Sequence, residues 1–482
     1  DIDVSTADVF ITGIVSAPGG FSSTGSTFNN TGGTITTTDT DITINHTGAI
    51  TIGAALLANG TGDIDIDSTG STIGIGATVT TSTGTITVDA NGITAVSAAV
   101  RATGAGTITF GATGTGPLTL SVADPAYVAQ TAGGTITFNR PVTLTQPTLI
   151  STGGGAVSGD IVFGAASSIS GAQTLELTAG TGDIRFGTAD GQCPIGTAPL
   201  TPLTSLTITS AEDVTFNSTV NAGFVLQSNS GSTGTTIFRG NVTTTTATGI
   251  DITNGTINLD GLTMTANNAG AVINLDGDVT LSTDAAELYA VQSITVTGTV
   301  SGTQDLTVGP STPATPDISF NGNVGTALLT PLGAITIANG YDVTFGGNVS
   351  AASITQDTGA NSTTFTGNVA TTGAILITDG YDITFSGTVN AASITQTNGA
   401  NSTTFAGDVT TNGAAGIDIT ATNIALDGLT MTAGTNPAAD IALTGAVTLS
   451  TTTVGLTAQN AITVTGTVDG GVPFSATSTN DA

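Results

Sequence analysis

The sequence predicts an all-β protein, a β-solenoid in which each coil of about 20 residues contributes three short strands. The first observation is a ladder of phenylalanines spaced by one coil, each followed four residues later by a valine: Phe345, Phe365, Phe385, Phe405, Val349, Val369, Val389 and Val409. A repeat this short cannot enclose its own core, so each unit has to bury its apolar face against the next. The second observation is composition. The 482 residues include 67 glycines and only 8% charged residues, which favours turns and strands over helices.

Each coil can be divided into strands from its own sequence. In the coil that begins at Tyr341, Val343 and Phe345 share one face and Thr344 takes the other, which is the alternation of a half-buried strand. Two glycines then permit a corner, and further short strands are expected near Val349 and Ile354. We expect the Phe and Val ladders to form the dry interior.

The repeat is stricter in the second half of the chain than in the first. We predict looser coils over 1–187, a Pro-rich loop excursion over 188–204, and regular coils over 205–482. Within the regular coils, residues 250–300 and 417–468 are an internal duplication. This organisation predicts one continuous stack and no separate globular domain.

Charge excludes some partners. The formal net charge is -30 and only four residues are basic, all of them arginines. Binding to phosphate backbones needs clustered cations, so nucleic acid is not an expected partner. No apolar stretch is long enough for a membrane helix, so membrane insertion is not expected either.

The repeats resemble the filamentous-haemagglutinin-like and autotransporter-type surface proteins of Gram-negative bacteria. The resemblance covers most of the chain and consists of coils near 20 residues, richness in Thr, Ala, Gly and Asn, and scarcity of Lys and Cys. It implies a right-handed parallel β-helix and a location outside the cell or on its surface. The Asn-Pro-Asn motifs of that family's secretion domain do not occur in this sequence.

We therefore expect a non-enzymatic extracellular structural protein, without a cofactor, that forms part of a surface fibre, surface layer or adhesin stalk. Its expected partners are further coils, either in a longer chain or in other copies that associate end to end. The alternative is a protein that binds host or environmental glycans or cleaves carbohydrate, with Tyr341 and Tyr381 at equivalent corners. A less favoured alternative is ice binding through an outward ladder of threonines: Thr344, Thr364, Thr384 and Thr404.

The one candidate metal site is a run of aspartates. Asp63, Asp65 and Asp67 alternate with isoleucines, which places the three carboxylates on one strand face about 6.8 Å apart. That spacing is too wide for neighbours alone to chelate one ion, so calcium would need oxygens from an adjacent coil. Solvated aspartates on an outward face are the simpler expectation.

Two single residues complete the candidates. His46 is the only histidine and Cys193 the only cysteine, so no metal-binding pair of these residue types and no intrachain disulfide can form. We expect His46 to be an exposed strand residue and Cys193 an inert thiol beside Pro194. No catalytic residue is predicted.

Overall fold

The computed structural model describes residues 1–122, 127–153, 158–188, 191–198, 200–228, 233–311, 314–325 and 331–479. The chain is 57% strand in an all-parallel sheet that winds through about 21 turns of about 22 residues each. The described ranges contain no helix. The predicted all-β solenoid is confirmed, although its mean coil is slightly longer than the 20 residues that separate the phenylalanines of the last coils.

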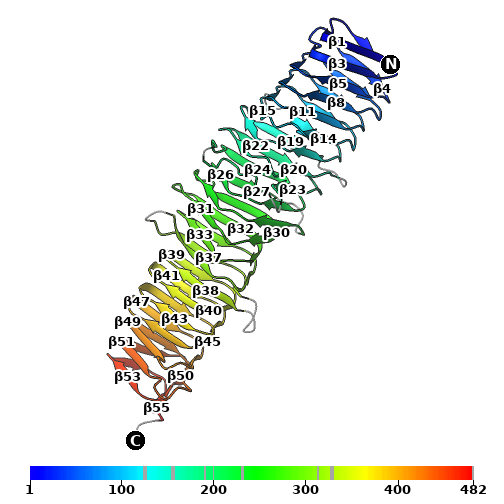
Figure 1. Ribbon diagram of the computed structural model, residues 1–482. Helices are drawn as coiled ribbons and strands as arrows, with labels where there is room; N and C mark the ends of the chain where they lie inside the picture. The colour runs from blue at the N-terminus through cyan, green and yellow to red at the C-terminus, as the bar shows by residue number, and fades with distance from the viewer. Residues whose placement is uncertain are drawn as a thin grey trace. The chain divides into compact units, whose positions relative to one another are not determined.

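The chain divides into two compact units, Asp1–Thr244 with Ile252–Gly255, and Thr245–Asp251 with Thr256–Ala482. Within each unit the strands of successive coils lie side by side (Figure 1). β30 (Ile250–Leu259) contributes residues to both units.

The strands of the first unit are β1 (Ile2–Phe10), β2 (Val15–Ser16), β3 (Phe21–Asn29), β4 (Ile35–Thr38), β5 (Ile42–His46), β6 (Ile50–Ile52), β7 (Leu56–Asn59), β8 (Ile64–Ser68), β9 (Ile73–Ile75), β10 (Val79–Thr81), β11 (Ile86–Ala90), β12 (Thr94–Val96), β13 (Val100–Ala102), β14 (Ile108–Phe110), β15 (Leu118–Leu120), β16 (Tyr127–Gln130), β17 (Ile136–Phe138), β18 (Val142–Leu144), β19 (Thr148–Ser151), β20 (Ile161–Phe163), β21 (Ile169–Ser170), β22 (Thr174–Thr178), β23 (Ile184–Phe186), β24 (Ser205–Ser210), β25 (Val214–Phe216), β26 (Val220–Ala222), β27 (Val225–Gln227), β28 (Thr235–Phe238) and β29 (Val242–Thr244).

The strands of the second unit are β31 (Thr263–Ala266), β32 (Val272–Leu281), β33 (Ala286–Ala290), β34 (Ser293–Val296), β35 (Val300–Gly302), β36 (Leu306–Pro310), β37 (Asp317–Phe320), β38 (Leu332–Ile337), β39 (Gly340–Phe345), β40 (Val349–Gln356), β41 (Gly359–Phe365), β42 (Val369–Thr371), β43 (Ala374–Ile377), β44 (Gly380–Phe385), β45 (Val389–Ala391), β46 (Ser393–Gln396), β47 (Gly399–Phe405), β48 (Val409–Thr411), β49 (Ile417–Asp427), β50 (Thr430–Ala433), β51 (Ile441–Ser450), β52 (Val454–Ala458), β53 (Ile462–Thr465), β54 (Val468–Gly470) and β55 (Phe474–Ser478).

The predicted phenylalanine ladder forms the interior of the second unit. Phe345, Phe365, Phe385 and Phe405 are in register and at most 1% exposed. Their rings stack face to face, with centroids 4.9, 4.9 and 5.1 Å apart. The four valines are also in register and at most 2% exposed. Both ladders are confirmed as core.

A second phenylalanine stack lies in the first unit, where the coils vary more in length. Its centroids are 4.7 to 5.2 Å apart, and its members are Phe110, Phe138, Phe163, Phe186, Phe216 and Phe238. Since strands of adjacent coils are spaced about 4.8 Å apart, one phenylalanine per coil gives a continuous column. Unequal coil lengths are accommodated outside the strands.

The glycine of the repeated Thr-Phe-x-Gly-x-Val segment is required by a close approach between coils. A Cβ atom on Gly387 would lie 2.5 Å from the carbonyl oxygen of Gly367, and a Cβ on Gly407 would lie 2.5 Å from that of Gly387. Only glycine fits this corner without moving the backbone, so the corner and the phenylalanine spacing are set by the same short motif.

Part of the predicted Pro-rich loop over 188–204 belongs to the stack of coils. Ile195 forms parallel bridges with Ile169 in the preceding coil and Val220 in the next one, and it is fully buried. Residues 189, 190 and 199 of the segment lie outside the described residues.

Candidate functional site

The three predicted calcium ligands lie on the outer side of the first unit. Asp65 and Asp67 project from β8, whereas Asp63 immediately precedes that strand. Asp63 already accepts a hydrogen bond through Oδ1 from the backbone N–H of Thr85, at 2.6 Å. Among the residues that the structure describes, no group of three or more His, Cys, Asp or Glu side chains is placed to hold a metal ion. The described residues therefore offer no preformed set of calcium ligands at this position.

Asp65 and Asp67 are nevertheless unusual carboxylates. Partial burial raises the pKa of Asp65, and the negative charges of Asp67, Asp89 and Asp63 raise it further. The pKa of Asp67 is raised by burial and then by Asp89, its neighbour in register on β11. Ionisation of Asp65 and Asp67 is therefore less favourable in the folded chain than in the unfolded chain.

Asp89 is the carboxylate in this region that pairs with a cation, and no pattern in the sequence indicates this pair. Its Oδ1 lies 2.6 Å from Nη2 of Arg140, and the two side chains are 6% and 1% exposed. Burial alone would raise the pKa of Asp89, but hydrogen bonds from Thr113 and Gly114 and the charge of Arg140 together hold it below its usual value. The pair links coils that are far apart in sequence.

Arg140 has two further acceptors in the buried cluster. Nη1 donates to the carbonyl oxygen of Ala90 and to Oγ1 of Thr94, at 3.2 and 3.3 Å. A Cβ atom on Gly111, whose φ is +84°, would lie 2.3 Å from Nε of Arg140. The glycine therefore leaves the space that the guanidinium occupies. The cluster is a structural tie, because the hydrogen bonds of Arg140 and Asp89 join three coils, although Nε of Arg140 is buried without a hydrogen-bond partner.

Several other aspartates share one structural role with asparagines. An Asp or Asn Oδ1 of one coil accepts a hydrogen bond from a backbone N–H of the next, and the acceptors include Asp41, Asp63, Asp160, Asp183, Asp213, Asp278, Asn323, Asn348, Asn368, Asp408 and Asp440. These bonds satisfy amides at the corners, where the strand ladder is interrupted. These aspartates thus support the stacking of coils.

The expectation of an exposed His46 is wrong. His46 is 0% exposed because it continues the inward face of Ile42 and Ile44 on β5. Its Nε2 lies 3.0 Å from Oγ of Ser23, and its ring centroid lies 5.6 Å from that of Phe28. Nδ1 is buried without a hydrogen-bond partner. Burial lowers the pKa of His46, which favours the neutral imidazole.

Cys193 is buried as well, with 1% of its surface exposed. Burial raises the pKa of its thiol to about 12, so the reactive thiolate is scarce at neutral pH. The inert thiol predicted from sequence agrees with this environment.

The threonine ladder and the two tyrosines lie on the outer surface of the second unit. Thr344, Thr364, Thr384 and Thr404 are in register as predicted. Two residues on, the second rank contains Gly346, Thr366, Ser386 and Ala406, so the surface carries one threonine column and not a paired array. Tyr341 and Tyr381 are 46% and 44% exposed.

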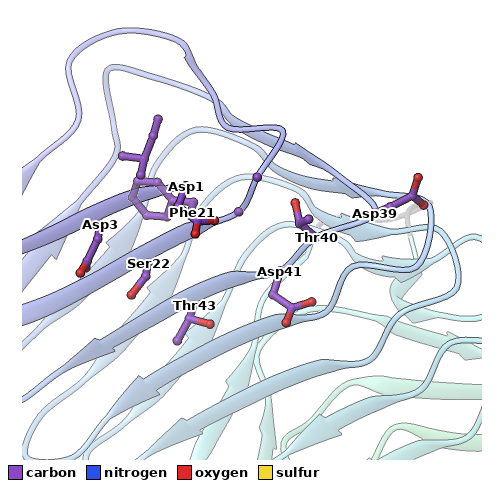
Figure 2. Close-up of a pocket in the computed structure, with 11 residues that line it drawn as sticks. Asp1, Asp3, Phe21, Ser22, Asp39, Thr40, Asp41 and Thr43 are labelled. Atoms are coloured by element: carbon purple, nitrogen blue, oxygen red, sulfur yellow. The ribbon is translucent and has the colours of Figure 1, made fainter.

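A pocket lined by acidic residues lies beside the first strands of the chain. It has a volume of about 480 Å³, and Figure 2 shows carboxylates of Asp1, Asp3, Asp39 and Asp41 around it. Asp39 and Asp41 accept backbone hydrogen bonds from Thr61 and Asp63. Two of the four carboxylates are thus already engaged in joining coils.

Comparison of the chain with protein-family models, with curated proteins and with solved structures finds no match in any of the three. The described part of the chain also contains no helix that could cross a membrane. The fold class thus rests on the parallel coils themselves, and function has to be argued from them.

Proposed function

We propose that this chain is a non-enzymatic, extracellular structural β-solenoid that forms the spacer of a surface fibre, surface layer or adhesin stalk of the filamentous-haemagglutinin-like or autotransporter type. The observation that supports the proposal best is the pair of uninterrupted phenylalanine stacks, one in each unit, with centroid spacings of 4.7 to 5.2 Å. Because the rings of neighbouring coils are closely packed, such a stack resists bending over the coils that it spans.

The environments of the titratable groups also favour a structural role. The thiol of Cys193 is protonated at neutral pH, His46 bonds to a serine, and Asp89 is held by Arg140. Catalytic groups are instead set up so that a nucleophile meets a base or a developing charge meets a donor. The three side chains instead pack in the core or join neighbouring coils.

Association of copies end to end is the second element of the proposal. On the last described coil, Val468 and Phe474 are 45% and 42% exposed, although they are in register with the buried Val447 and Val454. β55 pairs with β52, and no second partner strand occurs among the described residues. An open strand edge with uncovered apolar side chains accepts a further coil, which either a continuing chain or another copy would supply.

Light scattering over a concentration series, with electron microscopy of the same samples, tests this association. We expect filaments in the wild type and their loss in Phe474→Asp, which places a charge on the inward face of β55. Ser475→Asp is the matched control, because Ser475 is exposed on the outward face of the same strand. A wild-type chain that stays monomeric at every concentration, pH and calcium level would refute the association.

A glycan-binding face is a second candidate function, favoured by the repeated surroundings of Tyr341 and Tyr381. Each tyrosine precedes an aspartate that accepts hydrogen bonds from an Asn and a Ser one coil later. One coil, that of β41, separates the two rings, which gives a spacing of about 9.6 Å. Exposed aromatic rings beside polar groups are suited to stacking against sugars.

A glycan array with the wild type and with Tyr341→Ala/Tyr381→Ala tests this second function. Selective binding by the wild type that is lost in the double alanine variant and kept in Tyr341→Phe/Tyr381→Phe would support it. An array with no selective signal would eliminate it, without bearing on filament formation.

A further inference from the structure

Arg101 differs from the other three arginines in the partners of its guanidinium. Arg140 pairs with Asp89, Arg185 pairs with Asp160 and Asp183, and Arg239 donates to Oδ1 of Asn217. Arg101 forms no hydrogen bond or ion pair with any described residue, and its Nε, like that of Arg140, is buried without an acceptor. A buried donor with no partner is costly and calls for an explanation.

The position of Arg101 explains why no carboxylate reaches it. It projects outward from β13, and its register neighbours are Thr80 on β10 and Gln130 on β16, both neutral. The ion-paired Arg185, by contrast, has Asp183 two residues before it and Asp160 on the preceding coil. In a chain of net charge -30, an arginine that has no hydrogen bond or ion pair with any described residue is an exception.

Arg101 lines a surface pocket of about 200 Å³, formed by Arg101, Ala102, Thr103, Gln130, Thr131 and Ala132. The amide of Gln130 forms no hydrogen bond within the described residues. The hydroxyl of Thr103 donates to the carbonyl oxygen of Thr81, which leaves its oxygen able to accept. Thr131 is 2% exposed and its hydroxyl donates to the carbonyl oxygen of Gly134 inside the coil. The pocket thus offers one cation, one amide and one hydroxyl acceptor.

We propose that the Arg101 pocket binds a small sugar that carries one carboxylate. The planar guanidinium matches a carboxylate with two parallel N–H···O bonds. Gln130 and Thr103 suit the hydroxyl groups of a sugar ring. The charge of the whole chain repels ligands with several negative charges, so a singly charged ligand fits better than a sulfated or phosphorylated chain. This site needs neither filament formation nor the tyrosine face.

Ligand-observed NMR with D-glucuronate tests the proposal, at an ionic strength of about 0.15 M so that long-range repulsion is screened. D-Glucose is the neutral matched ligand, and inorganic sulfate is the competing small anion. We expect glucuronate to bind the wild type and glucose to bind at least about tenfold more weakly, since the charged fork contributes most of the affinity.

Arg101→Gln should weaken glucuronate binding on the order of tenfold, whereas Arg185→Gln removes the same charge elsewhere and should leave binding unchanged. If Arg101→Gln does not fold, Gln130→Ala decides the question, because it removes only the amide and should still reduce binding. The proposal is overturned if the wild type does not bind glucuronate, if both arginine variants bind alike, or if glucose binds equally well. Displacement of glucuronate by an equal concentration of sulfate would also overturn it in favour of a general anion site.

Discussion

Arg140 donates to the carboxylate of Asp89 across 2.6 Å, although 51 residues separate the two in the sequence. One coil lies between the coils of Asp89 and Arg140, and its residues Thr113 and Gly114 donate hydrogen bonds to the same carboxylate. Three successive coils of the first unit are thus joined at one buried charge pair.

Removal of Arg140 should be strongly destabilising. Arg140→Met leaves the charge of Asp89 buried with only its three hydrogen bonds, and such a loss costs about 3–5 kcal/mol. We expect Asp89→Leu/Arg140→Met to be more stable than Arg140→Met, because the double variant leaves no unpaired charge. Denaturant unfolding of the wild type, both single variants and the double variant gives the coupling energy. Equal stability of Arg140→Met and wild type would show that the pair contributes nothing.

The phenylalanine stack predicts a sharp contrast between two phenylalanines. Phe385 is 1% exposed and stacks on rings 4.9 and 5.1 Å away. Phe385→Ala should therefore cost about 3–5 kcal/mol. Phe10→Ala is the control, because Phe10 is 67% exposed, and it should change stability by no more than about 0.5 kcal/mol. Urea unfolding measures both, and similar costs for the two variants would contradict a stacked core.

The glycine corner makes a prediction that does not depend on apolar burial. Gly387→Ala adds one methyl group that meets the carbonyl oxygen of Gly367 at 2.5 Å, so it should lower the melting temperature by several degrees. Gly13→Ala is the matched control, since a Cβ there has no atom within 4 Å. If both variants melt together with the wild type, the corner has more room than the structure indicates.

The ladder of the second unit could be predicted because its coils are equal in length, so sequence spacing equals register. In the first unit, Phe163 and Phe186 belong to the stack, but unequal coils hide them from a search for a fixed period. The contact between Arg140 and Asp89 depends on the lengths of two irregular coils, which no local pattern determines. The burial of His46, by contrast, could be predicted, because alternation along β5 places it on the same inward face as Ile42 and Ile44.

His46 predicts a stability that depends on pH. Its folded pKa lies below the ordinary value of 6.5 because the ring is buried, so the unfolded chain takes up a proton at a pH where the folded chain does not. The stability due to neutral His46 is therefore complete above pH 6.5 and falls as pH decreases towards the folded pKa, by up to about 1.4 kcal/mol per pH unit. His46→Gln retains a partner for Ser23 but does not titrate, so it should lack this loss.

Denaturant unfolding of the wild type and of His46→Gln at pH 7.5 and pH 5.5 isolates the effect of His46 on stability. The 34 acidic residues are the same in both proteins, so their effect cancels in the comparison. We expect the wild type to lose stability relative to His46→Gln between these two values. His46→Phe, which packs on Phe28 and also does not titrate, provides a second comparison should glutamine fit poorly. The same change with pH in wild type and both variants would mean that the folded chain accepts the proton on His46 as readily as the unfolded chain. Its buried Nδ1 would then have to reach water through local opening of the first coils.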